Sequence, residues 1–480
     1  MANAFVFDLP PCARFQSKPK SDYMNSTPDI NASPKRLFQL TAPIWLAQLL
    51  SMSWGFMDTA MLAAFSNKDL AALAIAGSFY MVLNVSGKGF LQALAPISAH
   101  LFGQKKFSEI GSMTRQAIYV ALVLAVIGIA VLLSPGYLNL ATLEPEVREK
   151  SRLYLYVISF GLLAVFLMRV LSALAQAVGQ PQRYAQLLLI GVGVKFALNY
   201  ALVFGFANVP AFGVVGCAAA TAATNWILCL LGAVYLWRSS EFHLFSIFKF
   251  ELPDWRQQWA LFRFGLPFGI GYWLEVAVFS AIAVSMSQLG TNALAANQIV
   301  SNFANLLFTI PLSISLAVAV QMGHLLGEGR EAESYRAGMF ALKISAVLAI
   351  VLAGAAWLAP NILVILYHPA PELMPMMTSI LGFLVIYHLC DATQSVASFL
   401  NRAHKNAWWP AITYAICMWG VALNLGYVLA YGWAGKFSAP FPGLAGFYIG
   451  QIAGLGLAGT MMFAYWRRIL VKSTTANNTL

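Results

Sequence analysis

The feature of this sequence that most constrains its fold is a succession of twelve long apolar segments separated by short polar connections. A helix needs about 20 apolar residues to cross the hydrocarbon core of a bilayer, and these segments reach or exceed that length. Because the bilayer offers no hydrogen-bond partners to the backbone, such segments fold as helices. The sequence therefore predicts an all-α polytopic membrane protein with twelve transmembrane helices. The segments are 37–65, 70–102, 113–134, 152–178, 184–206, 213–237, 259–289, 294–326, 335–359, 372–400, 408–431 and 444–466.

Composition supports a bilayer as the main partner and argues against nucleic acid. Only 10% of the 480 residues are charged and 60% are hydrophobic, whereas soluble domains carry about 25% charged residues. The net charge of +11 comes largely from Lys and Arg in the connections on one side of the predicted membrane. No nucleic-acid motif accompanies these bases. The connections on the opposite side hold five: Lys68, Arg148, Lys150, Arg152 and Lys436.

This asymmetry predicts the orientation and location of the chain. Basic loops face the cytoplasm, so both termini are expected there, in a multi-pass protein of the bacterial inner membrane. Residues 1–36 are polar and lack the apolar core of a signal peptide, so we expect a flexible cytoplasmic tail. A second tail is expected at 469–480. The five cysteines form no CxxC pair or Cys/His cluster, so the sequence indicates neither zinc nor a disulfide framework.

The two halves of the chain resemble each other. "PIWLAQLLSM" at 43 parallels "PFGIGYWLEV" at 267, "LAALAI" at 70 parallels "LAANQI" at 294, and "SAHLFGQKKFSE" at 98 parallels "MGHLLGEGREAE" at 322. "ALNYALV" at 197 parallels "ALNLGYV" at 422, so all four pairs keep nearly the same offset along the chain. A duplicated six-helix unit predicts two pseudo-symmetric lobes related by an axis along the membrane normal. The predicted parts are an N-lobe at 37–237, a cytoplasmic linker at 238–258 and a C-lobe at 259–468.

Three acids interrupt the apolar segments: Asp58, Glu275 and Asp391. A charge near the bilayer centre costs about 2.5–3.5 kcal/mol even on insertion scales, and such residues usually mark ion or substrate pathways. A buried carboxylate can carry a proton, bind a small cation through its oxygens, or pair with an organic cation. The competing interpretation is that each acid is hydrogen-bonded inside the bundle and only fixes packing.

Asp391 and Asp58 have polar neighbours at helical spacing. Tyr387 precedes Asp391 by four residues and Gln394 follows it by three, so a phenol and an amide come within reach of this carboxylate. Lys195 stands four residues before Asn199 on the same helical face. If the first and fifth helices meet, Lys195 could pair with Asp58.

The remaining intramembrane polar residues allow simpler interpretations. Gln298, Asn302 and Asn305 form a stripe on the eighth helix, for which helix–helix hydrogen bonding is the main interpretation and a binding role the other. Arg169 is close enough to a loop to extend its charge to the membrane surface. Lys88 sits deeper, and its "SGKG" lacks the spacing of a phosphate-binding loop.

Several stretches together resemble one transporter family over residues 37–468: "MDTAM", "GLPFGIGYWLEVAVF", "GVVGCAAATAATNW" and "YHLCDATQSVASFLNRAHKN". They are similar to the NorM-like branch of the multidrug and toxic compound extrusion (MATE) family. The resemblance implies a twelve-helix exporter with two lobes and an outward-opening V. It also implies export of small organic cations, dyes and amphiphilic drugs in exchange for Na⁺ or H⁺, without a cofactor.

The resemblance also assigns roles to individual residues. Asp58 matches the family's first-helix acid, and Asn199 matches an asparagine on the fifth helix. Glu275, Tyr387 and Asp391 match the residues of a C-lobe cation site, which could hold Na⁺. Lys195 departs from the family pattern, in which many relatives carry Asn or an apolar residue at this position. A fixed ammonium beside Asp58 would disfavour a sodium ion there and hold the carboxylate ionised.

The sequence predicts a monomeric antiporter that works by alternating access, and it leaves alternatives. A flippase for a lipid-linked precursor belongs to the same superfamily, but would be expected to line its cavity with Arg and Lys. A narrow-specificity metabolite exporter is a further possibility. An enzyme is not expected, because the intramembrane ionisable residues form no catalytic cluster.

Overall fold

The computed structural model describes residues 32–134, 136, 144–206, 210–432, 441 and 443–477. Within these residues the chain is helical and contains no β-strand. All twelve predicted segments are helices, so the prediction of an all-α, twelve-helix fold is confirmed. The helices are α2 (Pro34–Phe65), α3 (Asn67–Gln92), α4 (Leu94–Gly103), α5 (Phe107–Leu133), α6 (Pro145–Ala177), α7 (Pro181–Val203), α8 (Gly213–Arg238), α9 (Ser240–His243), α10 (Trp255–Met286), α11 (Thr291–Gly327), α12 (Glu331–Leu358), α13 (Asn361–Tyr367), α14 (Met374–Ala403), α15 (Trp408–Ala415), α16 (Leu423–Tyr431) and α17 (Leu444–Asn477).

Eleven helical spans among the described residues are long and apolar enough to cross a membrane. The twelfth, α2, has a lower hydropathy because polar side chains such as Gln48, Ser51 and Asp58 interrupt it. A helix with polar residues on one face must turn that face toward other helices or a cavity rather than toward lipid. The low hydropathy of α2 is therefore a first sign that this helix lines a polar site.

Local sequence explains several helix boundaries. Ser33 caps α2 by accepting a hydrogen bond from the Arg36 backbone N–H (3.3 Å), and Pro34 occupies the first turn, where no N–H is needed. The second predicted segment divides into α3 and α4 at Ala93. Pro96 has no N–H to donate to the carbonyl of Gln92, so the helix is interrupted there. The eleventh segment also departs from a plain α-helix, because residues Ile416–Ala422 form a wider π-helical turn between α15 and α16.

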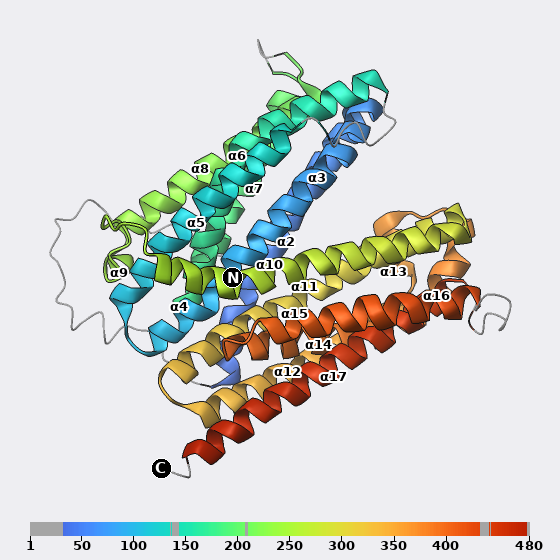
Figure 1. The fold of residues 1–480 in the computed structure, drawn as a ribbon. Helices are drawn as coiled ribbons and strands as arrows, with labels where there is room; N and C mark the ends of the chain where they lie inside the picture. The colour runs from blue at the N-terminus through green and yellow to red at the C-terminus, as the bar shows by residue number, and fades with distance from the viewer. Residues whose placement is uncertain are drawn as a thin grey trace, which may run out of the picture.

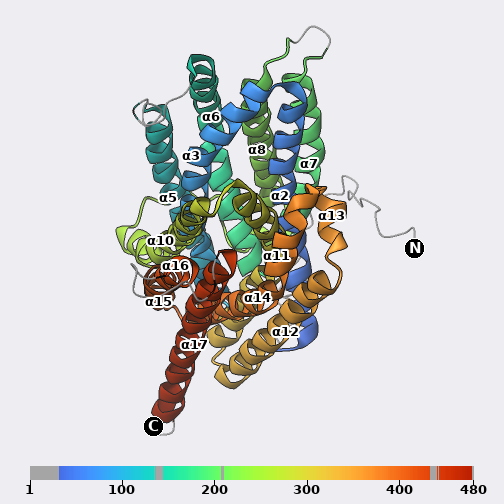
Figure 2. The same cartoon turned by 90° about the vertical axis from the view of Figure 1, so that its right-hand side faces the viewer.

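The helices form two groups (Figures 1 and 2). The N-lobe comprises α2 to α8, in which α6 packs on α3, α5 and α8 while α2 packs on α7. The C-lobe comprises α10 to α17, in which α14 packs on α11, α12 and α17. Figure 1 shows the two groups diverging from the end that carries α9 and the α4–α5 turn, here called the linker end.

The lobes contact each other through equivalent elements of the sequence repeat. Helix α3 of the N-lobe packs on α10 of the C-lobe. Helix α11, the C-lobe counterpart of α3 and α4 in the repeat, packs on α2 and α4 of the N-lobe. Gly103 and Gly327, which occupy equivalent positions of the two repeats, meet at the linker end. A Cβ atom at Gly103 would lie 2.1 Å from the carbonyl oxygen of His324, and one at Gly327 would lie 2.3 Å from that of His100. This reciprocal contact places the pseudo-twofold axis between α4 and α11.

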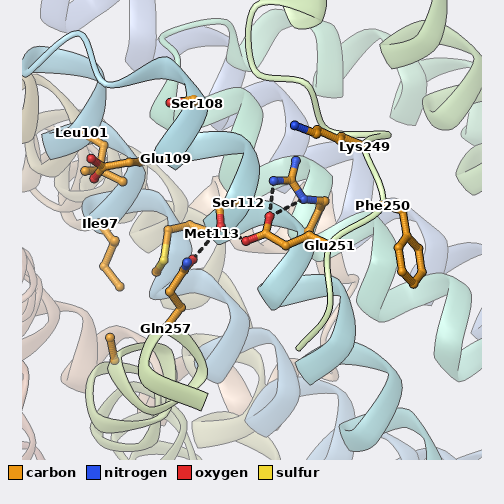
Figure 3. A pocket seen from close by; sticks show the side chains of 12 residues that line it. Ile97, Leu101, Ser108, Glu109, Ser112, Met113, Lys249, Phe250, Glu251 and Gln257 are labelled. Atoms are coloured by element: carbon orange, nitrogen blue, oxygen red, sulfur yellow. Dashed lines mark hydrogen bonds and ion pairs between the residues drawn. The ribbon is translucent and has the colours of Figure 1, made fainter. Parts of the chain in front are cut away.

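The connection between the lobes, residues 239–254, is held against α5 by hydrogen bonds. Glu251 accepts hydrogen bonds from Ser112 (2.7 Å) and from the Arg115 guanidinium, and the Tyr119 hydroxyl donates to the Glu251 carbonyl (2.7 Å). The hydrogen bonds from Ser112 and Arg115 hold the pKa of the Glu251 carboxyl below its usual range. Figure 3 shows Ser112 and Glu251 at the edge of a cavity of about 770 Å³ on the linker end. The connection therefore belongs structurally to the N-lobe, up to the start of α10.

Two of the predicted boundaries differ from the helices. Helix α2 begins at Pro34, three residues before the predicted start of the N-lobe, and residues 1–31 of the expected tail lie outside the described residues. Helix α17 continues to Asn477 and so includes most of the segment 469–480 that was expected to be a tail.

Candidate functional site

The first ionisable centre lies in the N-lobe, where α2, α7 and α8 meet. The Lys195 ammonium lies 2.7 Å from Asp58 Oδ1, and Asn199 Nδ2 donates to the same oxygen at 2.6 Å. Lys195 also donates to Asn199 Oδ1 (3.3 Å) and to the Thr221 hydroxyl. The three N–H groups of the ammonium thus have three acceptors, which a buried charge requires. We call Asp58 and Lys195 the N-lobe pair.

Burial differs between the two members of this pair. The Lys195 side chain is 0% exposed, whereas that of Asp58 is 14% exposed. Asp58 reaches a cavity of about 630 Å³, here called the N-lobe cavity, which is lined from α2, α3, α6, α7 and α8. The carboxylate is therefore the member of the pair that a cavity ligand can contact directly.

Two further cations line the N-lobe cavity: Lys88 from α3 and Arg169 from α6. Both side chains are half-buried. Arg169, which was expected to extend its charge to the membrane surface, lies in the wall of this cavity, and that expectation stays a prediction. Both residues also line an adjoining pocket of about 20 Å³, here called the N-lobe floor pocket, together with Gln92 and Gln176. Within the described residues, neither Lys88 nor Arg169 has a carboxylate within ion-pair distance.

The second centre lies in the C-lobe, around Glu275 on α10 and Asp391 on α14. Electrostatic interactions link Asp391 to Glu275, and Tyr387 to both acids. The Tyr387 ring is buried and packs edge-on against Tyr448, with ring centroids 6.1 Å apart. Both carboxylates are half-buried, and the part of the chain that the structure describes places no Lys or Arg nitrogen within ion-pair distance of either. We call Glu275, Tyr387 and Asp391 the C-lobe acid site.

Glu275 faces a small cavity of about 100 Å³ that Gln394 and Tyr414 also line. Gln394 is buried, and its amide nitrogen lies 3.7 Å from Met462 Sδ. The spacing of Gln394 and Asp391 placed both on one helical face, but the amide lies beside Glu275 in this cavity. Among the described residues, the cavity therefore offers a ligand one carboxylate and one amide, together with the phenols of Tyr272 and Tyr414 and the hydroxyls of Ser395 and Ser398.

Arg402 is a residue of this cavity that the sequence did not single out. Its guanidinium stacks over the rings of Phe268 (4.1 Å) and Phe399 (4.7 Å) and interacts electrostatically with Glu275. Arg402 follows Asp391 by eleven residues, which is three helical turns on the same face. This spacing could identify it from the sequence, although Arg402 lies just after the predicted tenth segment, beside a basic connection.

Gln298 does not join either centre. Its amide donates to Asn302 Oδ1 at 3.3 Å, four residues along the same helix, and both side chains are exposed. We expected Gln298 to hydrogen-bond to a neighbouring helix, but its side chain is exposed and bonds within α11. Asn305, one turn further, is also exposed.

The two ionisable centres differ in the ligands that they offer a cation. No group of three His, Cys, Asp or Glu side chains within the described residues is arranged to hold a metal ion. The C-lobe acid site supplies two carboxylates and a phenol, which are hard oxygen ligands suited to a small hard cation. The N-lobe pair is less suited, since Lys195 already neutralises Asp58.

Comparison with known proteins agrees with this architecture. The sequence profile of the MatE family matches residues 43–201 and 267–428, which is more than half of the chain and covers both repeats. The "Probable multidrug resistance protein NorM" of Aromatoleum aromaticum is 33% identical over 439 residues, covering 91% of this chain and 94% of that protein. The "Multidrug resistance protein NorM" of Aliivibrio fischeri is 30% identical, covering 89% and 93%.

Solved structures show the same fold. A MATE crystal structure in the straight conformation superposes with a TM-score of 0.83 at 17% identity, covering 92% of this chain and 97% of that one. The outward-facing structure of a multidrug resistance MATE family transporter gives a TM-score of 0.82 at 16% identity, covering 92% and 96%. With the family match over both repeats, these likenesses show that the chain belongs to the MatE family, on its NorM-like branch, and is a multi-pass membrane transporter rather than an enzyme.

Proposed function

We propose that this protein is a secondary active multidrug exporter that exchanges Na⁺ or H⁺ for small organic cations and other amphiphilic drugs. The observation that carries the proposal is the C-lobe acid site, which holds two half-buried carboxylates without a basic partner at ion-pair distance in the described chain. A protein retains such costly groups where they bind a mobile cation. The names of the NorM relatives support the multidrug part of the proposal.

Transport in this scheme follows from competition for one site. A coupling ion held by Glu275 and Asp391 neutralises the charge that would otherwise attract a cationic substrate. Binding of the ion and binding of the substrate therefore favour different arrangements of the two lobes, and coupling needs only this difference in affinity. The tight glycine contact between α4 and α11 is expected to close the linker end while the lobes are apart at the other.

The N-lobe pair is proposed to act as a gate rather than as the main ion site. Because Lys195 holds a fixed positive charge 2.7 Å from Asp58, a sodium ion gains little there. A proton or a substrate cation that takes over the Asp58 carboxylate would release Lys195 from it. The alternative is that the pair is purely structural.

The orientation and assembly follow the charge pattern. The linker end, with its basic connections, is proposed to face the cytoplasm of a bacterial inner membrane, so that both termini are cytoplasmic. The protein is proposed to work as a monomer, because each lobe carries its own ionisable centre.

The test is dye transport in proteoliposomes. Vesicles containing the full chain are loaded with a fluorescent organic cation, and a Na⁺ gradient and a proton gradient are imposed in separate experiments. Export driven by one gradient alone supports antiport and identifies the coupling ion. If neither gradient moves any of several dyes, multidrug antiport is rejected.

A flippase for a lipid-linked precursor is the second candidate. Lys88 and Arg169 in the N-lobe cavity favour it, because such a lipid carries phosphate groups that basic side chains bind. Fluorescent analogues of anionic lipids in the same vesicles distinguish the two candidates, since a flippase moves them between leaflets without an ion gradient or a dye.

A further inference from the structure

The N-lobe cavity carries more positive than negative charge. Among the described residues it is lined by one acid, Asp58, and that carboxylate is already paired with Lys195. Lys88 and Arg169 add two charges that repel each other, and Lys88 interacts with Glu275 of the opposite lobe only at longer range than an ion pair. Two cations without an adjacent carboxylate are expensive in a membrane interior, so their presence requires a function or a partner.

The opposite lobe shows what stands at equivalent positions. When Gly103 is aligned with Gly327, Ser51 aligns with Glu275 and Lys88 aligns with Leu312. Ser51 and Lys88 line the N-lobe floor pocket. Glu275 and Leu312 line the small C-lobe cavity. The C-lobe pocket therefore has an acid where the N-lobe has a hydroxyl. It has an apolar side chain where the N-lobe has Lys88.

Helices α6 and α14 are also equivalent in the two repeats, and a comparison at the position of Arg169 again shows a base in the N-lobe and none in the C-lobe. Each helix is followed by a turn that contains one residue with positive φ, Gly179 after α6 and Lys405 after α14, and we align the two helices on these residues. In this alignment Arg169 is equivalent to Ser395, which also lines the C-lobe pocket. The N-lobe pocket thus carries two bases and no acid among the described residues, whereas the C-lobe pocket combines the acid Glu275 with the base Arg402.

The surroundings of Lys88 and Arg169 suit an anion attached to an apolar body. In the floor pocket, Gln92 Nε2 donates to Gln176 Oε1 (3.0 Å), and Gln176 Nε2 donates to the Ser172 hydroxyl (3.0 Å), so neutral polar groups surround the two cations. The described residues that line the floor pocket include no acid. Above it, the 630 Å³ cavity has walls that include Trp54 and Leu188, and this volume is in the range of drug-sized sites.

We propose that Lys88 and Arg169 form an anion-binding site that holds the carboxylate of an amphiphilic substrate in the N-lobe cavity. The substrate class is an organic anion or a zwitterion, and in a zwitterion the cationic part can approach Asp58. A bidentate guanidinium together with an ammonium is a strong arrangement for a carboxylate. This inference rests on the proposed export function and specifies part of its substrate range.

The experiment uses two dyes that differ in one charge. Rhodamine B carries an ionised carboxylate at neutral pH, and its ethyl ester keeps the cationic ring system without it. Binding of each dye to the purified full chain is measured by fluorescence anisotropy for the wild type, Lys88→Gln and Arg169→Gln. Lys88→Arg tests rescue by the conserved charge, and Lys343→Gln, an exposed base on α12, is the matched control.

The expected result is a change confined to the acid dye. Each neutral variant should raise the Kd of rhodamine B about tenfold, as expected for one charge-assisted interaction, and that of the ester less than about twofold. Lys88→Arg should retain most of the affinity, and Lys343→Gln should match the wild type. Equal losses for both dyes would indicate a structural role for these bases and overturn the proposal, as would no loss.

Two further measurements separate this inference from its alternatives. If proteoliposomes export both dyes and the variants bind rhodamine B as the wild type does, the proposed export function is retained and the anion-binding site is rejected. If rhodamine B binding depends on Lys88 and Arg169 but neither dye is exported, the anion-binding site is retained and the proposed export function is rejected. Displacement of rhodamine B by a small fraction of phosphatidylglycerol in the bilayer would assign the site to a lipid phosphate and overturn the assignment to an exported carboxylate.

Discussion

The N-lobe pair allows a quantitative test of how two buried charges depend on each other. Asp58→Asn leaves the Lys195 ammonium at 0% exposure, with Asn199 and Thr221 as neutral acceptors. Lys195→Met leaves Asp58 with the Asn199 amide and partial access to the N-lobe cavity. The two single variants therefore create unpaired charges in unequal surroundings.

The magnitudes follow from these surroundings. Removing one partner of a buried ion pair costs about 3–5 kcal/mol. Asp58→Asn is expected at the upper end, about 5 kcal/mol, because the ammonium has no contact with water. Lys195→Met is expected near about 3 kcal/mol, because the carboxylate is 14% exposed. The double variant removes both charges and should recover to within about 1 kcal/mol of the wild type.

The assay is thermal unfolding of the purified protein in detergent, followed at one fixed scan rate because unfolding of such proteins is commonly irreversible. At about 2–4 °C per kcal/mol for a unit the size of one lobe, Asp58→Asn should lower Tm by on the order of 10 °C or more. Lys195→Met should lower it less, and the double variant should lie within a few degrees of the wild type. Lys343→Met, which removes an exposed base from α12, is the control.

Two outcomes would contradict this reasoning. If the double variant loses as much as the two single variants added together, the charges do not depend on each other, and their 2.7 Å contact contributes nothing beyond packing. If Lys195→Met lowers Tm more than Asp58→Asn does, the burial of the remaining charge does not determine how much stability is lost.

Three further predictions concern other parts of the molecule. Asp391→Asn should abolish ion-driven dye export with a normal Tm, since it removes one of the two C-lobe carboxylates; normal export would move the ion site elsewhere. Gly327→Ala should lower Tm by several degrees, because its Cβ would lie 2.3 Å from the His100 carbonyl oxygen, whereas Gly193→Ala, with open space, should have little effect. Because Ser112 and Arg115 hold the pKa of Glu251 below its usual value, ionised Glu251 stabilises the fold at neutral pH and this contribution is lost as the pH falls through the lowered pKa. Glu251→Gln should therefore lower Tm at pH 7 and reduce its fall between about pH 5 and pH 3, with Glu109→Gln as the control; an unchanged pH profile would contradict this role.

Much of the fold was predictable because the bilayer sets helix length. Twelve apolar segments gave twelve helices, and even the division of α3 from α4 has a local cause in Pro96. The π-helical turn at Ile416–Ala422 was not predictable in this way. The hydropathy of a segment does not record how many residues each turn contains.

The candidate site was predictable at the level of residues but less so at the level of contacts. Spacing placed Lys195 and Asn199 on one face, but only the packing of α7 on α2 brings them to Asp58. Arg169 and Arg402 both lie close to a connection in the sequence, and distance from a connection does not show which way a side chain points. Arg169 adds a second base to the N-lobe floor pocket, and Arg402 places a base in the pocket that Glu275 lines.

The fastening of the linker to α5 has a mechanical consequence for α10. Gln116 on α5 accepts a hydrogen bond from the Asp254 backbone N–H (3.0 Å), and its oxygen lies 3.2 Å from Gln258 Nε2, so the first turn of α10 is tied to the N-lobe. The far part of α10 packs on α15 and α16 of the C-lobe. A rotation of one lobe against the other must then bend α10. We expect the bend at Pro267, because this residue has no N–H to donate to the carbonyl of Arg263 and the helix lacks one hydrogen bond there.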